Sequence, residues 1–234
     1  MAVELTYITE KTCPLCQNTF HATKVRSKLR MIKQDTDFNT IFDQINPLYY
    51  AVFFCPSCGY AAQDTVFSDI SETLGRKIKA FLQTCDVNIG FPGLRSREQA
   101  ILLFKLAIFQ AELIEAKSSR LAGLYLRLAW LYREAEDEAM EQLAMEKALE
   151  HYERAVTKET FPIGNMNEVM ADYLIAQLQY RLGKLDLAAK GFGRIVSSAA
   201  AKHEKRIMEM SRDAWNEIKE KKKEETGESM DNED

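Results

Sequence analysis

The chain has 234 residues, of which 46% are hydrophobic and 28% are charged, and its formal net charge at pH 7 is −4. This composition is that of a globular protein, and the acidic balance excludes a polycation that binds nucleic acid over its whole surface. No basic segment followed by an apolar stretch opens the chain, and no apolar run could span a bilayer. We therefore expect a cytoplasmic protein without a membrane partner.

Four of the five cysteines form two Cys-Pro-X-Cys pairs near the N-terminus. Two cysteines separated by two residues can hold one metal ion from a tight turn, which Pro14 and Pro56 favour. Gly59 can adopt the positive φ that follows such a turn, whereas the first pair has Gln17 in that place. We predict a structural zinc site with four thiolate ligands, namely Cys13, Cys16, Cys55 and Cys58.

Other interpretations of these cysteines stay open at this stage. Iron suits the same tetrahedron of sulfurs, a dithiol redox pair is a further hypothesis, and burial as small apolar side chains is another. Burial alone does not explain prolines at matching positions. Because a closed four-sulfur site leaves no position for substrate, we do not expect the metal to be catalytic. We expect His21 to be an ordinary polar residue and Cys85 to be buried.

The segment between the two cysteine pairs has its own pattern. It predicts a strand over 23–32, a short helix over 35–47 that ends before a proline, and a strand over 48–55. One face of the first strand carries four basic residues: Lys24, Arg26, Lys28 and Arg30. One hypothesis is that this face binds phosphate or an acidic partner, and the other is that it is a solvated edge that its charges protect from aggregation.

The rest of the chain is rich in Ala, Leu, Glu and Lys and predicts helices. Ser96 is a good N-cap residue for the second of them. The predicted helices span about 68–84, 97–117, 119–134, 137–158, 165–182, 185–199 and 201–222. The fold class is mainly α, with a small zinc-ribbon-like α+β domain over 1–66 and a helical domain over 67–212. A linker is expected near 85–96, and 213–234 is expected to be a charged and partly disordered tail.

The helical part contains a pattern typical of tetratricopeptide (TPR) helix pairs in "YRLGKLDLAAKGFGRIV". Gly183 falls in the turn, and Ala188 and Phe192 fall on the second helix. A blurred copy around Ala148 lies 40 residues upstream instead of the regular 34. Stacked helix pairs form a groove that binds peptides or partner helices, whereas a plain helical bundle is the alternative. No catalytic motif is present, so we do not expect an enzyme, although an enzyme remains a third hypothesis.

The segment "NPLYYAVFFCPSCGYAAQ", together with the upstream "CPLC" and the helices, resembles the bacterial family called domain of unknown function 2225. The resemblance extends over nearly the whole chain up to the tail. It implies a cytosolic bacterial protein with a metal-binding N-terminal part and a helical repeat part, and it implies no activity. The leading hypothesis is a zinc-stabilised, TPR-like adaptor that binds an unidentified protein or peptide in its helical groove. The alternative is a nucleic-acid-associated zinc-ribbon protein that uses the basic strand 24–30.

Overall fold

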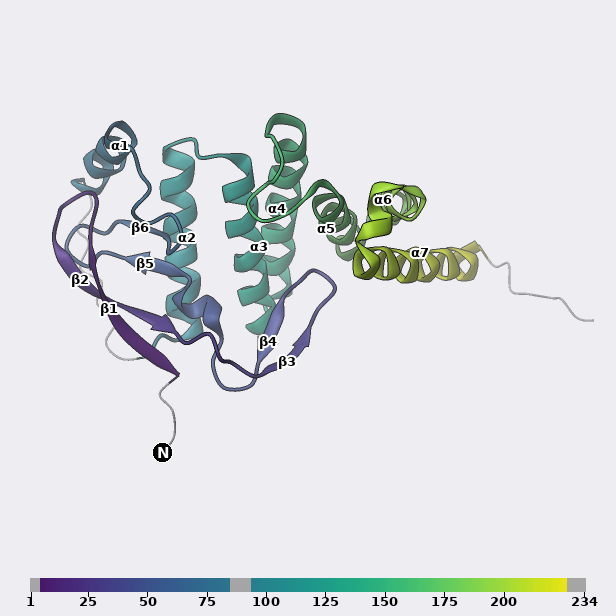
Figure 1. Ribbon diagram of the computed structural model, residues 1–234, viewed down its shortest axis with the longest axis horizontal. Coiled ribbons are helices and arrows are strands. Elements are labelled where there is room, and N and C mark those ends of the chain that lie inside the picture. The colour runs from purple at the N-terminus through teal and green to yellow at the C-terminus, as the bar shows by residue number, and fades with distance from the viewer. Residues whose placement is uncertain (1–4, 85–93, 227–234) are drawn as a thin grey trace, which may run out of the picture. The chain divides into compact units, whose positions relative to one another are not determined.

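The computed structural model describes residues 5–84 and 94–226 of the chain. The chain divides into two compact units, residues 1–144 (unit 1) and residues 145–234 (unit 2). Cys85, most of the predicted linker and the end of the predicted tail lie outside the described residues. The domain boundaries at 66 and 212 stay predictions. The fold is mainly helical with a region of β-hairpins near the N-terminus, as the sequence predicts (Figure 1).

The strands of unit 1 form three antiparallel hairpins, which pair β1 with β2, β3 with β4, and β5 with β6 (Figure 1). A short 3₁₀ helix, η1, covers Pro47–Tyr50 and precedes β5. Each hairpin joins strands that are neighbours in sequence, so every sheet contact of this region is local. The strands are β1 Thr6–Thr12, β2 Thr19–Val25, β3 Met31–Gln34, β4 Thr40–Phe42, β5 Val52–Phe54 and β6 Ala61–Gln63.

Three predictions for the segment between the cysteine pairs are wrong in whole or in part. The predicted strand over 48–55 is a strand only over Val52–Phe54, because Pro47–Tyr50 form the 3₁₀ helix η1. The continuous strand over 23–32 is interrupted, because β2 ends at Val25 and β3 begins at Met31. The predicted helix over 35–47 is instead the turn of the β3–β4 hairpin followed by β4, with Phe38 at a φ of 70°. A positive φ excludes this residue from a helix. The buried contacts of Asp37, described below, stabilise the hairpin over the local helical pattern.

The helices of both units match the predicted ones closely. Ser96 begins α2 with a reciprocal capping box to Gln99, and Gly183 follows α5 with a φ of 71°. These local signals explain why the helix ends were predictable. The helices are α1 Glu72–Leu82, α2 Arg97–Leu113, α3 Ser118–Glu134, α4 Glu138–Lys158, α5 Glu168–Arg181, α6 Leu185–Ser197 and α7 Lys205–Thr226.

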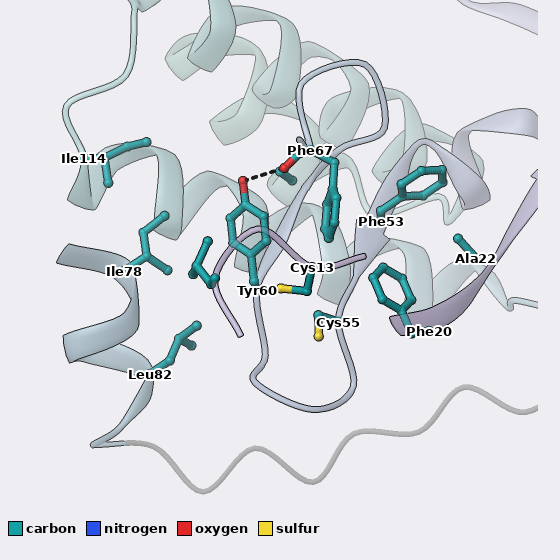
Figure 2. Packing of buried hydrophobic residues seen from close by; sticks show 12 residues of the cluster. Cys13, Phe20, Ala22, Phe53, Cys55, Tyr60, Phe67, Ile78, Leu82 and Ile114 are labelled. Carbon is teal, nitrogen blue, oxygen red and sulfur yellow. Dashed lines mark hydrogen bonds between the residues drawn. The ribbon is translucent and has the colours of Figure 1, made fainter. Parts of the chain in front are cut away.

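One hydrophobic cluster of unit 1 surrounds Phe67 (Figure 2). The ring of Phe67 meets those of Phe20 and Phe53 edge-on, with centroids 5.6 Å and 5.8 Å away. The hydroxyl of Tyr60 donates a hydrogen bond to the carbonyl of Phe67 at 3.2 Å. Ile78 of α1 belongs to the same cluster. Two hairpins and the first helix therefore share one core, and Figure 2 shows Cys13 and Cys55 between Tyr60 and Phe20.

In unit 2 a close contact between α5 and α6 depends on small residues. A Cβ atom built on Gly191 would lie 2.8 Å from the Cβ of Ala176, which is closer than real Cβ contacts come. Gly193 faces the indole of Trp215 in α7, at 3.6 Å from the position of such a Cβ atom. The tight α5–α6 packing offsets the low helix propensity of Gly191. Whether these helices are TPR repeats stays a prediction.

Within the described part of the chain, no helix combines the length and the apolar character that crossing a membrane requires.

Candidate metal centre

Each Cys-Pro-X-Cys pair lies in the turn of a hairpin, the first between β1 and β2 and the second between β5 and β6. In the first turn, the Gln17 N–H donates to the carbonyl of Cys13 at 3.0 Å. In the second, the Gly59 N–H donates to the carbonyl of Cys55 at 2.9 Å. Gln17 has a φ of 63° and Gly59 a φ of 79°. The two turns therefore have the same backbone shape, although only the second has the glycine that this shape favours.

The hairpins bring the four sulfur atoms into one cluster. Sγ of Cys13 lies 3.6 Å from Sγ of Cys58, and Sγ of Cys16 lies 3.6 Å from Sγ of Cys55. All four sulfurs lie within 4.8 Å of one another. A disulfide would need about 2.05 Å, whereas a metal tetrahedron with bonds of about 2.3 Å has sulfur–sulfur edges of about 3.8 Å. The four thiols are free, and their arrangement suits one metal ion.

Burial and mutual hydrogen bonding separate the pKa values of the thiols. The hydrogen bond with Cys58 lowers the pKa of Cys13 to about 5, against the opposing effect of burial. The same bond raises the pKa of Cys58, and burial raises the pKa of Cys55 to about 11. The cluster without metal therefore holds thiols and thiolate close together. A bound cation would replace the shared protons, because metals bind the thiolate form.

A buried glutamine of α2 holds the second cysteine turn, and sequence reasoning missed it. Gln110 has 1% of its surface exposed. Its Oε1 accepts a hydrogen bond from the Ala61 N–H at 3.0 Å, and its Nε2 donates to the Gly59 carbonyl at 2.9 Å. Both polar atoms of the side-chain amide thus form hydrogen bonds with the backbone that follows Cys58. The periodicity of α2 shows a buried position here but cannot show what a buried glutamine contacts.

The four basic residues predicted to share a strand face are separated in the structure. Lys24 lies within β2, whereas Arg26, Lys28 and Arg30 lie between the end of β2 and the start of β3. Lys24 forms an ion pair with Asp64 at 3.5 Å, and Arg30 lies 3.9 Å from Asp43. Binding of an anionic partner by these four residues stays a prediction. His21 is exposed on β2 and is not part of the sulfur cluster.

A buried ion-pair network attaches the β3–β4 hairpin to α3. Asp37 is fully buried and accepts hydrogen bonds from Arg133 at 2.7 Å and from the Trp130 indole at 3.2 Å. Arg133 also contacts Asp35 at 3.2 Å and Glu141 at 2.7 Å. Burial opposes the charge of Arg133, but the bonds to Asp37 and Glu141 outweigh it and raise its pKa. Nothing in the sequence pairs Asp35 and Asp37 with Arg133, which lies almost 100 positions further along the chain.

The Asn-Pro-X-Tyr segment attaches η1 to the end of α3. Asn46 caps η1 by accepting a hydrogen bond from the Leu48 N–H at 3.0 Å. Its Nδ2 donates to Glu134 at 2.7 Å, and the hydroxyl of Tyr49 donates to the other oxygen of the same carboxylate at 2.7 Å. The spacing of the motif thus directs two side chains to one acceptor. The same segment carries the family resemblance, and these contacts give it a physical role in the fold.

A family model described as "Uncharacterized protein conserved in bacteria (DUF2225)" matches residues 7–218. The chain belongs to this family. The match begins before the first cysteine pair of this DUF2225 chain and continues into α7, which confirms the resemblance stated from the sequence. No curated protein and no solved structure matches the chain. The family description names no activity, so the function has to be argued from the residues themselves.

Proposed function

We propose that this chain is a zinc-stabilised, TPR-like protein-interaction protein that acts as an adaptor in the bacterial cytoplasm and has no catalytic role. The observation that carries the proposal is the cluster of four free thiols within 4.8 Å of one another, on two matching hairpin turns. In a cytosolic chain such paired cysteines are more often metal ligands than disulfides, because the compartment is reducing.

Zinc is the metal that this site supports best. The filled d shell of Zn²⁺ imposes no coordination geometry of its own, so the ion accepts a tetrahedron of thiolates. Closed four-cysteine sites are typical of structural zinc. Iron has the same ligand geometry and is the competing metal. When bound, the metal supplies a cross-link between the β1–β2 and β5–β6 turns. Since Cys13 and Cys55 belong to the Phe67 cluster, that cross-link stabilises the core of unit 1.

The adaptor role is supported by the helical part of the chain. In unit 2, small residues allow α5 and α6 to pack closely, as in Gly191 against Ala176. Tyr173 and Phe192 pack beside that contact, with ring centroids 5.8 Å apart. Alternating small and large residues between helices are what a helical repeat needs to form a curved surface. We therefore place the partner, a protein or peptide, in the groove of this helical part.

Metal analysis of the purified full-length protein tests the first half of the proposal. We expect one zinc per chain in protein purified without chelator, and loss of the zinc with loss of stability in Cys55→Ser. Exposed Ser57→Ala, in the same turn, is the matched control and should keep its zinc. A metal content near zero, or one iron per chain, would contradict the zinc assignment.

Crosslinking in a native bacterial host tests the second half. We expect a reproducible protein partner whose capture depends on an intact helical part. Gly191→Val, which crowds the α5–α6 contact, should reduce capture. A protein that stays monomeric and captures no partner in repeated experiments would contradict the adaptor role.

A further inference from the structure

Unit 1 contains a cavity of about 890 Å³ beside the β3–β4 hairpin. All residues over 39–46 line it, so its wall runs along β4 and the turn that follows. The other walls come from the start of β1, from β3, from η1, from Leu94 and Arg95 before α2, and from the end of α3. Ligand sites commonly have volumes of about 300–1,000 Å³, so the cavity is large enough for a short peptide segment.

The backbone of β4 has an open hydrogen-bonding edge. Among the described strands, β4 pairs only with β3. The carbonyl of Asn39 and the N–H of Asp43 both bond to the β3 side of the hairpin, at 2.8 Å and 3.1 Å. Backbone groups alternate in direction along a strand, so those of Thr40 and Phe42 point away from β3. Both residues line the cavity, and such an edge can pair with another extended chain.

The side chains around this edge suggest what an added strand would carry. Four aromatic residues line the cavity, which gives a place for an apolar side chain: Phe42, Tyr49, Tyr50 and Trp130. Two carboxylates of the wall, Asp43 and Glu134, belong to exposed residues. The contact of Asp43 with Arg30 is a 3.9 Å surface pair, which contributes little and can be exchanged for a partner's basic group.

The basic groups of the wall are held by other interactions. Arg133 is bound by the carboxylates of the buried network, and Lys33 forms an ion pair with Asp35 at 3.2 Å. The Arg95 guanidinium donates to the carbonyls of Tyr49 and Val52 at 3.1 Å and 2.7 Å, and burial lowers its pKa to about 10. The partners of Glu134, Asn46 and Tyr49, are neutral and leave its negative charge uncompensated. Asp43 and Glu134 are therefore the charges better placed to attract a ligand, which favours a basic one.

The wall is also held in position before any ligand binds. The network of Asp37 with Arg133 and Trp130 fixes the hairpin to α3. The bonds of Asn46 and Tyr49 to Glu134 fix η1 to the same helix. A rigid wall lowers the entropic cost of binding, as a site that accepts a flexible peptide requires.

We propose that the open edge of β4 binds an extended peptide segment of a protein partner as an added strand. The segment places an apolar or aromatic side chain among the four cavity aromatics and a basic side chain near Asp43 and Glu134. Main-chain hydrogen bonds to Thr40 and Phe42 give affinity, and the two kinds of side chain give selectivity. The inference rests on the proposed role in protein interaction, but it places this contact in unit 1 and not in the helical groove.

Selection from a random octapeptide display library on the zinc-loaded, full-length protein tests this proposal. Thr40→Pro removes one outward N–H and serves as the counter-selection target. Thr40→Val is the matched control, since it keeps the N–H and a β-branched shape. We expect enrichment of peptides in which apolar and basic residues alternate. A selected peptide should bind Thr40→Val like the parent and Thr40→Pro about tenfold more weakly, as for one lost hydrogen bond.

Two further readouts do not depend on how well the proline variant folds. In a Trp215→Phe background, Trp130 is the single tryptophan, and its emission should change when the selected peptide is added. Amide exchange measured by NMR should slow at Thr40 and Phe42. The Ile41 N–H, which points toward β3, should be unchanged.

Several results would overturn the proposal. One is that no peptide is enriched over the Thr40→Pro counter-selection, and another is that bound peptide leaves the Thr40 and Phe42 amides unprotected. A concentration-dependent dimer that protects those amides would show a second copy as the occupant and not a partner peptide. If a native partner is captured equally by the parent and by Thr40→Pro, the β4 site fails while the adaptor role stands. If selected peptides protect the edge but no native partner is found, the adaptor role fails while the site stands.

Discussion

Gln110→Met tests whether α2 positions the second cysteine turn for metal binding. Methionine keeps the length of the side chain and removes both hydrogen bonds. The Ala61 N–H and the Gly59 carbonyl, 3.0 Å and 2.9 Å from the glutamine amide, would lose their partner in a buried place. An orphaned buried backbone group costs about 1–3 kcal/mol, so we expect a loss of roughly 2–5 kcal/mol in the free energy of unfolding of the zinc-loaded protein.

The same change should weaken zinc binding. Residues that orient metal ligands through hydrogen bonds typically contribute 10–100-fold to metal affinity, and Gln110 holds the backbone directly after Cys58. Competition with a chromophoric chelator measures the affinity, and urea unfolding at saturating zinc measures the stability. Gln177→Met is the matched control, because Gln177 is a buried glutamine of α5 in unit 2. We expect its zinc affinity to equal that of the parent.

An unchanged zinc affinity in Gln110→Met, together with an unchanged free energy of unfolding, would refute this reasoning. A fall in stability with an unchanged zinc affinity would show that Gln110 holds α2 to the hairpin but does not position the ligands. Equal losses of affinity in Gln110→Met and Gln177→Met would mean that the effect is general destabilisation.

Three further predictions follow from the structure. Gly191→Ala should lower the stability of unit 2 by about 1–3 kcal/mol in urea unfolding because of the 2.8 Å contact with Ala176, whereas Gly193→Ala should be neutral or stabilising; equal effects would contradict the packing argument. Gln17→Gly should raise the stability of the zinc-loaded protein by up to about 1 kcal/mol, and Gly59→Ala should lower it by about 1–2 kcal/mol, since both positions have positive φ; a loss in both variants would show that the side chain of Gln17 matters more than its backbone. Zinc affinity should rise with pH between 6 and 8, by about 100-fold or more per unit, because at least two thiols whose pKa is raised must lose their protons on binding; a pH-independent affinity would mean that the metal-free cluster is already fully ionised.

The sequence reveals most of the metal site because its signals are local. The two Cys-Pro-X-Cys pairs each contain a turn, and the turn residues at Gln17 and Gly59 lie one position after the second cysteine of each pair. Helix ends were equally readable where a side chain caps its own helix, as Ser96 does for α2. In each case the physical cause lies within about five residues of its effect.

The segment between the cysteine pairs shows where such reasoning fails. Apolar spacing over 35–47 suggests a helix, yet the structure has a hairpin with Phe38 at positive φ and Asp37 buried against Arg133. A buried carboxylate is stable there because a guanidinium from α3 pairs with it, and no local pattern contains that partner. Tertiary contacts thus decide between two backbone conformations that the local sequence leaves close in energy.

By itself, the sequence determined the composition of a possible metal site, the order of the helices and the family to which the chain belongs. Only the tertiary structure decided what supports that site and what lies beside it. Gln110 reaches the cysteine turn across about 50 residues, and Glu134 gathers Asn46 and Tyr49 across more than 80. Contacts of this kind depend on how hairpins and helices pack, because a polar side chain is satisfied in the interior only by a partner that folding brings to it.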